Sequence, residues 1–448
     1  MTEESVLPWL QGPLDLTALT AEVADPVLAR RGRDWWIAAG VSAFLTLIMV
    51  AAMAYSFENG VGAWGNNTSV VWGFPIANYV YWIGIGNAGT LISALLLVTR
   101  QKWRASINRF AEAMTLFAIS IAGIFPILHL GRPMYFYWLA PYPDGHGLWP
   151  QWRSALVWDF WAILSYLLFS IIFFYVGLIP DLATLRDRAR SRTAAVIFGL
   201  LAVGWRGSIR HWRAYERLVF LMACMAVPLV CSVHSIVGLD FAASLMPGWK
   251  ESIFPPYFVV GALFSGFAMV VLLAAWLRRA LDLTNIITTA HFEAMARVLL
   301  AASIVMGLSY ATEWFSAWYG GQKPDFSELA FTFGGPYRWL YFTMLFGNVI
   351  APQVLWLRRA RTDTRVLVIV AILINIGMWL ERILIILDTL SHGHLPSAWR
   401  LFTPTLIDIA ILTGSFGFFA LLMLMFSRLL PVVSMHDMRK LLAQEGLA

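Results

Sequence analysis

The sequence predicts an all-α, polytopic membrane protein with ten transmembrane helices. Charged residues make up only 13% of the 448 residues and hydrophobic residues make up 59%, and the mean hydropathy is +0.69. Soluble domains contain about 25% charged residues and about 45–50% apolar ones. Apolar windows of roughly 20 residues, the length that crosses a hydrocarbon core, also recur along the whole chain. The composition therefore excludes an ordinary soluble domain.

Ten such windows are present, separated by polar or charged connectors. They cover residues 35–57, 77–98, 110–129, 157–179, 216–239, 256–277, 294–317, 338–357, 365–387 and 405–428. The segment 191–205 is apolar but short, and basic residues flank it, so we expect a helix lying on the membrane surface rather than an eleventh span. The first 30 residues are mixed and partly acidic, without the apolar core of a cleavable signal.

The distribution of Lys and Arg predicts the orientation in the membrane. Of the 32 basic residues, 25 lie before the first span, after the last one, in the connectors that share their side, or at the span ends that adjoin those connectors. Because cytoplasmic connectors are enriched in Lys and Arg, both termini are expected in the cytoplasm of a bacterium, with the spans in its inner membrane. This predicts a cytoplasmic N-terminal segment (1–34), a transmembrane domain (35–428) and a cytoplasmic tail (429–448). Basic residues confined to short connectors also argue against nucleic-acid binding, despite a pI near 9.4.

Two parts of the chain resemble each other. The run RFAEAM at 109–114 and the run HFEAM at 291–295 each open an apolar span, and their glutamates are 181 residues apart. The two segments are four spans apart, so both run through the membrane in the same direction. We therefore expect two parallel four-helix-bundle repeats, at about 77–240 and 256–388. The first and last spans would lie outside the repeats.

Four ionisable residues fall at one depth, near the outer ends of three consecutive spans: His129, Asp159, His234 and Asp240. An ionisable side chain in a span is costly and usually faces the bundle interior. Aromatic residues surround this level, namely Tyr135, Tyr137, Trp138, Trp158 and Trp161. A neutral imidazole accepts a hydrogen bond from a hydroxyl group and carboxylates accept protons, which are the requirements of a quinol site. The alternative is that these residues cap helices or link them; a haem or zinc site is less well supported by the spacing.

A second polar set predicts a proton path across the bundle. Its members are Glu112, Glu293, Glu313, Glu381, Arg382, Asp388 and Asp408. Buried carboxylates with water between them can conduct protons, and Glu112 and Glu293 would form the cytoplasmic mouths. A structural ion pair between Glu381 and Arg382 is an adequate alternative explanation for these two residues.

The run HLGRP at 129–133, together with Asp159 and Asp240, resembles the NrfD/PsrC family of quinone-interacting membrane subunits. Ten spans and cytoplasmic termini make the chain most similar to ActC, the quinol-oxidising subunit of alternative complex III. The resemblance implies that His129, Asp159 and Asp240 act on quinol near the periplasmic face, with Arg132, Trp158, Trp161 and His234 contributing to binding.

The resemblance also implies cofactors and partners. Family members carry no redox cofactor or metal and take menaquinol or ubiquinol as substrate. They pass electrons to a periplasmic iron–sulfur protein, and in alternative complex III they assemble with multihaem and monohaem cytochromes c, which carry haem c, and with membrane subunits that include an ActF-like paralogue.

Two other functions fit the same pattern. One is the membrane anchor of a molybdenum-dependent reductase, and the other is a proton-conducting transporter without a redox role. The outer loop at 131–153 is aromatic and contains proline, which is typical of a docking surface for a partner protein and favours the redox complexes.

Overall fold

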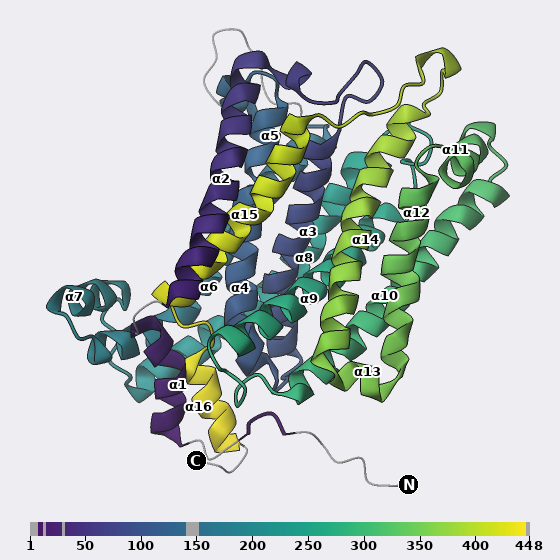
Figure 1. Ribbon diagram of the computed structural model, residues 1–448. Helices are drawn as coiled ribbons and strands as arrows, with labels where there is room; N and C mark the ends of the chain where they lie inside the picture. The colour runs from purple at the N-terminus through teal and green to yellow at the C-terminus, as the bar shows by residue number, and fades with distance from the viewer. Residues whose placement is uncertain (1–7, 12–14, 29–31, 140–151, 445–448) are drawn as a thin grey trace, which may run out of the picture.

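The computed structural model describes residues 8–11, 15–28, 32–139 and 152–444 (Figure 1). Within these ranges the chain forms helices and connectors and contains no strand. Nine of the described helices are long and apolar enough to cross a membrane. They are α2 (Arg33–Asn59), α3 (Phe74–Val98), α4 (Arg104–Ala122) with α5 (Ile124–His129), α6 (Ala155–Arg188), α8 (Ile209–Ala242), α9 (Phe254–Ala280), α10 (Thr289–Tyr319), α14 (Thr364–Ser391) and α15 (Leu406–Leu429). The predicted fold class, an all-α polytopic membrane protein, is confirmed.

The span predicted at 338–357 is not one regular helix. It consists of α12 (Arg338–Leu345), a π-helical turn (Phe346–Ile350) and a 3₁₀ segment (Ala351–Trp356). Pro352 has no backbone N–H to continue an α-helical ladder, and π-turns occur mostly as local insertions that are frequent at functional sites. The count of ten crossing helices therefore stays a prediction.

Several helices extend beyond their apolar windows. α6 and α8 begin and end outside the predicted limits of 157–179 and 216–239, because helical hydrogen bonding continues into the polar connectors where the hydropathy signal stops. The surface segment is also helical: α7 (Arg192–Leu201) has no buried residue and lies beside the bundle in Figure 1.

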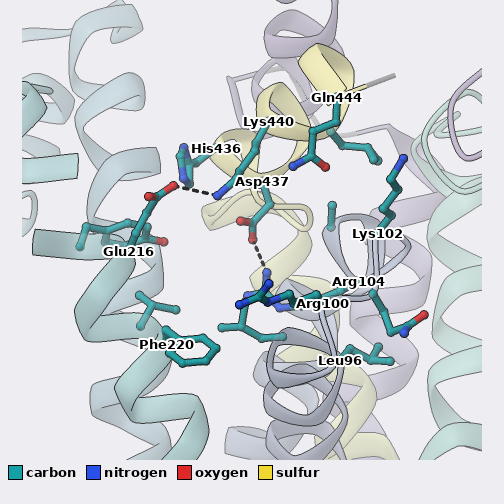
Figure 2. Close-up of a pocket in the computed structure, with 16 residues that line it drawn as sticks. Leu96, Arg100, Lys102, Arg104, Glu216, Phe220, His436, Asp437, Lys440 and Gln444 are labelled. Atoms are coloured by element: carbon teal, nitrogen blue, oxygen red, sulfur yellow. Dashed lines mark hydrogen bonds and ion pairs between the residues drawn. The ribbon is translucent and has the colours of Figure 1, made fainter. Parts of the chain in front are cut away.

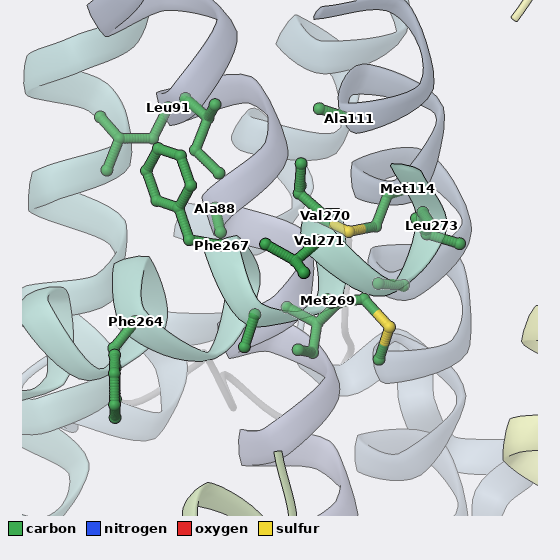
Figure 3. Close-up of a cluster of buried hydrophobic side chains, with 14 of the residues drawn as sticks. Ala88, Leu91, Ala111, Met114, Phe264, Phe267, Met269, Val270, Val271 and Leu273 are labelled. Atoms are coloured by element: carbon green, nitrogen blue, oxygen red, sulfur yellow. The ribbon is translucent and has the colours of Figure 1, made fainter. Parts of the chain in front are cut away.

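The centre of the bundle is formed by α3, whose most apolar window is 89% buried. Figure 3 shows apolar side chains of α3, α4 and α9 packed together around it. A Cβ atom at Gly89 would fall on the backbone carbonyl of Ala111, and one at Gly266 would fall on Ala88. These two glycines allow α4 and α9 to approach α3 closely, which fixes the positions of the helices that carry the site residues.

The outermost helices form a pair. α2 runs alongside α15 (Figure 1), and only 22% of the apolar window of α2 is buried. This arrangement agrees with a first and last span outside the central helices. The proposed four-helix repeats remain a prediction.

The two ends of the bundle differ. α1 (Leu16–Leu28), α7, α13 (Arg358–Thr362) and α16 (Met435–Gln444) lie at one end, whereas α5 and α11 (Lys323–Gly334) lie at the other (Figure 1). The predicted C-terminal tail thus contains a docked helix, because Met438, Leu441 and Leu442 of α16 are buried against the bundle.

Candidate functional site

A cavity of about 390 Å³ lies at the α5 end of the bundle, among α3, α5, α6 and α8. His129, Asp159 and Asp240 all line it, so the structure brings together three residues that the sequence singled out. Most of the other lining residues are apolar, for example Ile76 and Leu164. Ligand pockets typically have volumes of about 300–1,000 Å³ and combine apolar walls with a few polar groups.

His129 reaches the cavity because the chain breaks its helix at Gly123, between α4 and α5, and His129 is the last residue of α5. Its imidazole stacks on Trp64, with ring centroids 6.0 Å apart, and meets the edge of Trp72 at 6.1 Å. The ring also forms a hydrogen bond with the backbone of Val71. These contacts fix the orientation of the imidazole in the cavity wall.

Asp159, near the start of α6, is only 4% exposed and accepts a hydrogen bond from the hydroxyl group of Tyr79. Asp240, near the end of α8, lines the same cavity, and its carboxyl group lies near that of Asp159. The Oδ1 atoms of both aspartates are buried without a partner in the part of the chain that the structure describes. A buried acceptor without a partner is costly, and a ligand hydroxyl would satisfy it.

Tyr79 is the cavity residue that the sequence analysis missed. Its phenol is 5% exposed and connects α3 to Asp159, 80 residues later in the chain. The available signal was its position, because Tyr79 lies near the start of the apolar window 77–98, as Asp159 lies near the start of the window 157–179. Nothing local in the sequence pairs it with an aspartate of another helix.

Four predicted binding residues do not line this cavity. The Nδ1 atom of His234 lies 2.6 Å from the side-chain amide of Asn87, deeper in the bundle, as a structural contact between α8 and α3. Trp158 is 39% exposed and Arg132 is also exposed, while Trp161 lies outside the cavity. Sequence reasoning could not give the direction of their side chains, which decides whether a residue near the end of a span lines the cavity.

The predicted aromatic docking loop is described only in part. The 3₁₀ helix Pro133–Leu139 follows α5 directly. The side chains of Met134, Phe136 and Tyr137 are exposed there. Residues 140–151, which make up most of the loop, lie outside the described residues.

A second, acidic cavity of about 60 Å³ lies among α9, α10, α11 and α14. Such a volume has room for a few water molecules. Six carboxyl-bearing residues line it: Glu251, Glu313, Asp325, Glu328, Glu381 and Asp388. Three members of the predicted proton path, Glu313, Glu381 and Asp388, therefore meet here.

Glu381 is held by several helices at once. It accepts a hydrogen bond from the hydroxyl group of Tyr310 and a weaker one, at 3.3 Å, from the side chain of Asn348 in the π-helical turn. Arg382 lies 3.0 Å from Glu381, so the structural ion pair anticipated from the sequence is formed. Asp388 accepts a hydrogen bond of 2.5 Å from Thr332 of α11.

The remaining path residues lie apart from both cavities. Glu112 accepts a hydrogen bond of 2.5 Å from Ser93, and Glu293 lies 2.8 Å from Arg297. Asp408 caps the start of α15 and accepts a hydrogen bond of 2.8 Å from the backbone N–H of Gly65. This structural role accounts for Asp408 without a part in proton transfer.

Comparison with known proteins gives the following matches. The family described as "Polysulphide reductase, NrfD" matches residues 62–391. A putative membrane subunit of the dimethyl sulfoxide reductase of Halobacterium salinarum is 26% identical over 245 residues, which are 54% of this chain and 51% of that protein. A selenate reductase subunit of Mesobacillus selenatarsenatis is 20% identical over 416 residues, which are 88% of this chain and 93% of that protein. The first match thus spans about half the length of the relative.

Proposed function

The chain belongs to the NrfD family, and from this premise we propose that it is the quinol-binding membrane subunit of a multi-subunit oxidoreductase. The observation that carries the proposal is the cavity in which His129, Asp159 and Asp240 meet. The proposed reaction is the oxidation of quinol to quinone, with the release of two protons and two electrons.

Each polar group of the cavity has a place in this reaction. The imidazole of His129 would accept a hydrogen bond from one quinol hydroxyl group. The Oδ1 atom of Asp159, which has no partner among the described residues, would accept a hydrogen bond from the other hydroxyl group. The carboxylates of Asp159 and Asp240 can each accept a proton, so the pair has capacity for the protons that leave the quinol. Tyr79 orients Asp159 by donating to its second oxygen.

The surroundings of these groups suit a ring that arrives from the lipid. Leu130 and Leu156 line the cavity and are also 42% and 51% exposed on the outside of the bundle. An apolar path from the lipid-facing surface to the polar groups admits a hydrophobic quinol without crossing water. By the predicted orientation this end is periplasmic, so electrons would leave to a partner iron–sulfur subunit on that side.

Two kinds of complex are candidates for the proposed subunit. The combination of ten predicted spans and cytoplasmic termini supports the ActC-like subunit of alternative complex III, with cytochromes c as partners. The names of the relatives, which are subunits of dimethyl sulfoxide and selenate reductases, support the membrane anchor of a molybdenum-dependent reductase. Both use the same cavity, and they differ in the partner that exchanges electrons with it.

Purification of the tagged chain with its native partners tests the proposal. We expect a complex that oxidises or reduces a quinone in a defined redox assay. Haem c in its absorption spectrum would support alternative complex III, and molybdopterin would support the reductase. A chain that purifies without any redox partner and conducts protons in vesicles would contradict the proposal and support a transporter.

We also propose that the acidic cavity, which Asp388 lines, and Glu293, which lies outside that cavity, take part in proton movement. Replacing Glu293 by Gln or Asp388 by Asn is expected to lower proton translocation by the complex more than it lowers electron transfer. The physical reason is that both residues lie outside the quinol cavity, so their loss leaves the redox site intact. Proton uptake and quinone turnover are measured together in vesicles that contain the purified complex.

The control for this pair is Asp363→Asn, an exposed helix cap at the start of α14. It removes a carboxylate from the same helix as Asp388 without changing either cavity. Equal loss of translocation and electron transfer in the Glu293 and Asp388 variants, or no loss of either, would assign these carboxylates to the scaffold.

A further inference from the structure

A cavity of about 420 Å³ lies at the opposite end of the bundle from the quinol site, between the ends of α3, α4, α8 and the C-terminal helix α16. Figure 2 shows that its lining has two zones. Polar and charged side chains, among them Lys102 and Lys440, lie toward α16, and Leu96 and Phe220 lie toward the bundle. It shares no lining residue with the proposed quinol cavity or with the acidic cavity.

Positive charge dominates the polar zone. Four cationic side chains line the cavity against two carboxylates, an excess of two positive charges. The cations are Arg100, Lys102, Arg104 and Lys440, and the carboxylates are Glu216 and Asp437. His436 adds no charge at neutral pH, because burial lowers the pKa of its imidazole, which stacks on Trp212 at 4.2 Å.

The cationic side chains differ in how strongly they interact with the carboxylates around them. Arg104 lies 3.1 Å from Asp437, and both side chains are mostly buried. Lys440 lies 2.8 Å from Glu216, but both are about half exposed, so this pair is weak and can rearrange. The side chain of Arg100 has no hydrogen-bond or ion-pair partner within the described ranges, and the residue is exposed.

The backbone of Arg100 is also unusual. Its φ angle is +56°, in the left-handed region that favours glycine or asparagine. A long cationic side chain is therefore placed at the cavity where the local backbone would favour a smaller residue. Left-handed residues occur at helix C-terminal ends as well as at ligand-binding positions, and Arg100 directly follows the C-cap residue of α3.

The apolar zone continues into the membrane-facing surface of α8. Phe220 and Leu97 line the cavity, Phe220 is 39% exposed, and the neighbouring Leu221 is 61% exposed. A ligand that fits both zones has an anionic group beside an apolar chain. Anionic phospholipids have this structure, and basic pockets between transmembrane helices on the cytoplasmic side recognise their headgroups.

We propose that this cavity binds one anionic phospholipid, whose headgroup phosphate contacts Arg100 and Lys440 and whose acyl chain lies against Leu97 and Phe220. The bound lipid would bridge α3, α8 and α16, and it would hold the C-terminal helix against the bundle. The site is independent of the proposed quinol chemistry, so either proposal can fail without the other.

Binding of phosphatidylglycerol to the purified full-length chain in detergent, measured by native mass spectrometry, tests this proposal. Each basic residue near a membrane surface changes affinity for anionic lipid by about fivefold. We therefore expect about 25-fold weaker binding for the double variant Arg100→Asn, Lys440→Gln. Asparagine tolerates the left-handed backbone of position 100, so the fold is retained. The charge-conserving variant Arg100→Lys, Lys440→Arg is expected to bind like the unaltered chain.

The matched control is Arg279→Asn, which removes an exposed cation at the corresponding end of α9, outside the cavity. The affinity of this variant for phosphatidylglycerol is expected to be unchanged. An equal loss of affinity in this control would show that the lipid is attracted by overall charge alone, and it would overturn the proposed site. Two ligands complete the test. Phosphatidylcholine, which has no net charge, and glycerol phosphate, which has no acyl chain, are both expected to bind at least tenfold more weakly. Equal binding of phosphatidylcholine would overturn the role of charge, and equal binding of glycerol phosphate would replace the lipid by a soluble anion.

Discussion

Replacing Asp159 by Asn is expected to lower quinol turnover by about 10²–10⁴-fold, the usual contribution of a general base. The amide oxygen of the asparagine still accepts the hydrogen bond from Tyr79, so the cavity keeps its shape. The side chain no longer takes a proton from the quinol. Turnover is measured in membranes with a soluble electron acceptor, after co-purification has established that the complex assembles. His129→Leu is expected to have a comparable effect by removing a hydroxyl partner.

Two controls make this prediction specific. Asp187→Asn changes an exposed aspartate at the other end of the same helix, and its turnover is expected to be unchanged. Tyr79→Phe and Tyr81→Phe remove hydroxyl groups two residues apart on α3. Tyr79 bonds to Asp159, whereas Tyr81 bonds to Asn375 away from the cavity. Only the Tyr79 variant is expected to lose activity. Normal turnover in the assembled Asp159 variant would remove this residue from the reaction.

Replacing Arg109 by Met is expected to destabilise the protein by about 3–5 kcal/mol, because it leaves a buried carboxylate without its partner. Arg109 lies 3.0 Å from Asp181, and each side chain is only 2% exposed. The guanidinium group also donates a hydrogen bond of 2.6 Å to the backbone of Gly177. Thermal unfolding of the full chain in detergent, followed by helical circular dichroism, measures the loss.

The double variant Arg109→Met, Asp181→Leu is expected to recover most of this stability, since an apolar pair can replace a buried ion pair. Arg186→Met is the control at a surface pair: Arg186 lies 2.7 Å from Asp187, which is 65% exposed, so a change below about 1 kcal/mol is expected. An Arg109 variant that unfolds like the unaltered chain would show that the charge of Asp181 is neutralised in another way.

The residues of the proposed quinol cavity could be found in the sequence because a buried ionisable side chain carries a large free-energy cost in a membrane. An ionisable residue in an apolar window is retained only where the folded protein compensates it, so Asp159 and Asp240 were visible as candidates. His129 was visible from its position at the outer end of a span. The same reasoning also selected Asp408 and His234, because hydropathy does not distinguish a helix cap or a core hydrogen bond from a polar group in a cavity.

The sequence by itself therefore determined that the chain is a helical membrane protein and where most of its long apolar helices lie. Those properties depend on local apolarity, which can be summed along the chain. Only the tertiary structure decided that Tyr79 meets Asp159, that the span around Pro352 is interrupted, and that α16 docks on the bundle. These contacts join residues far apart in the chain, and the direction of each side chain depends on how closely neighbouring helices pack.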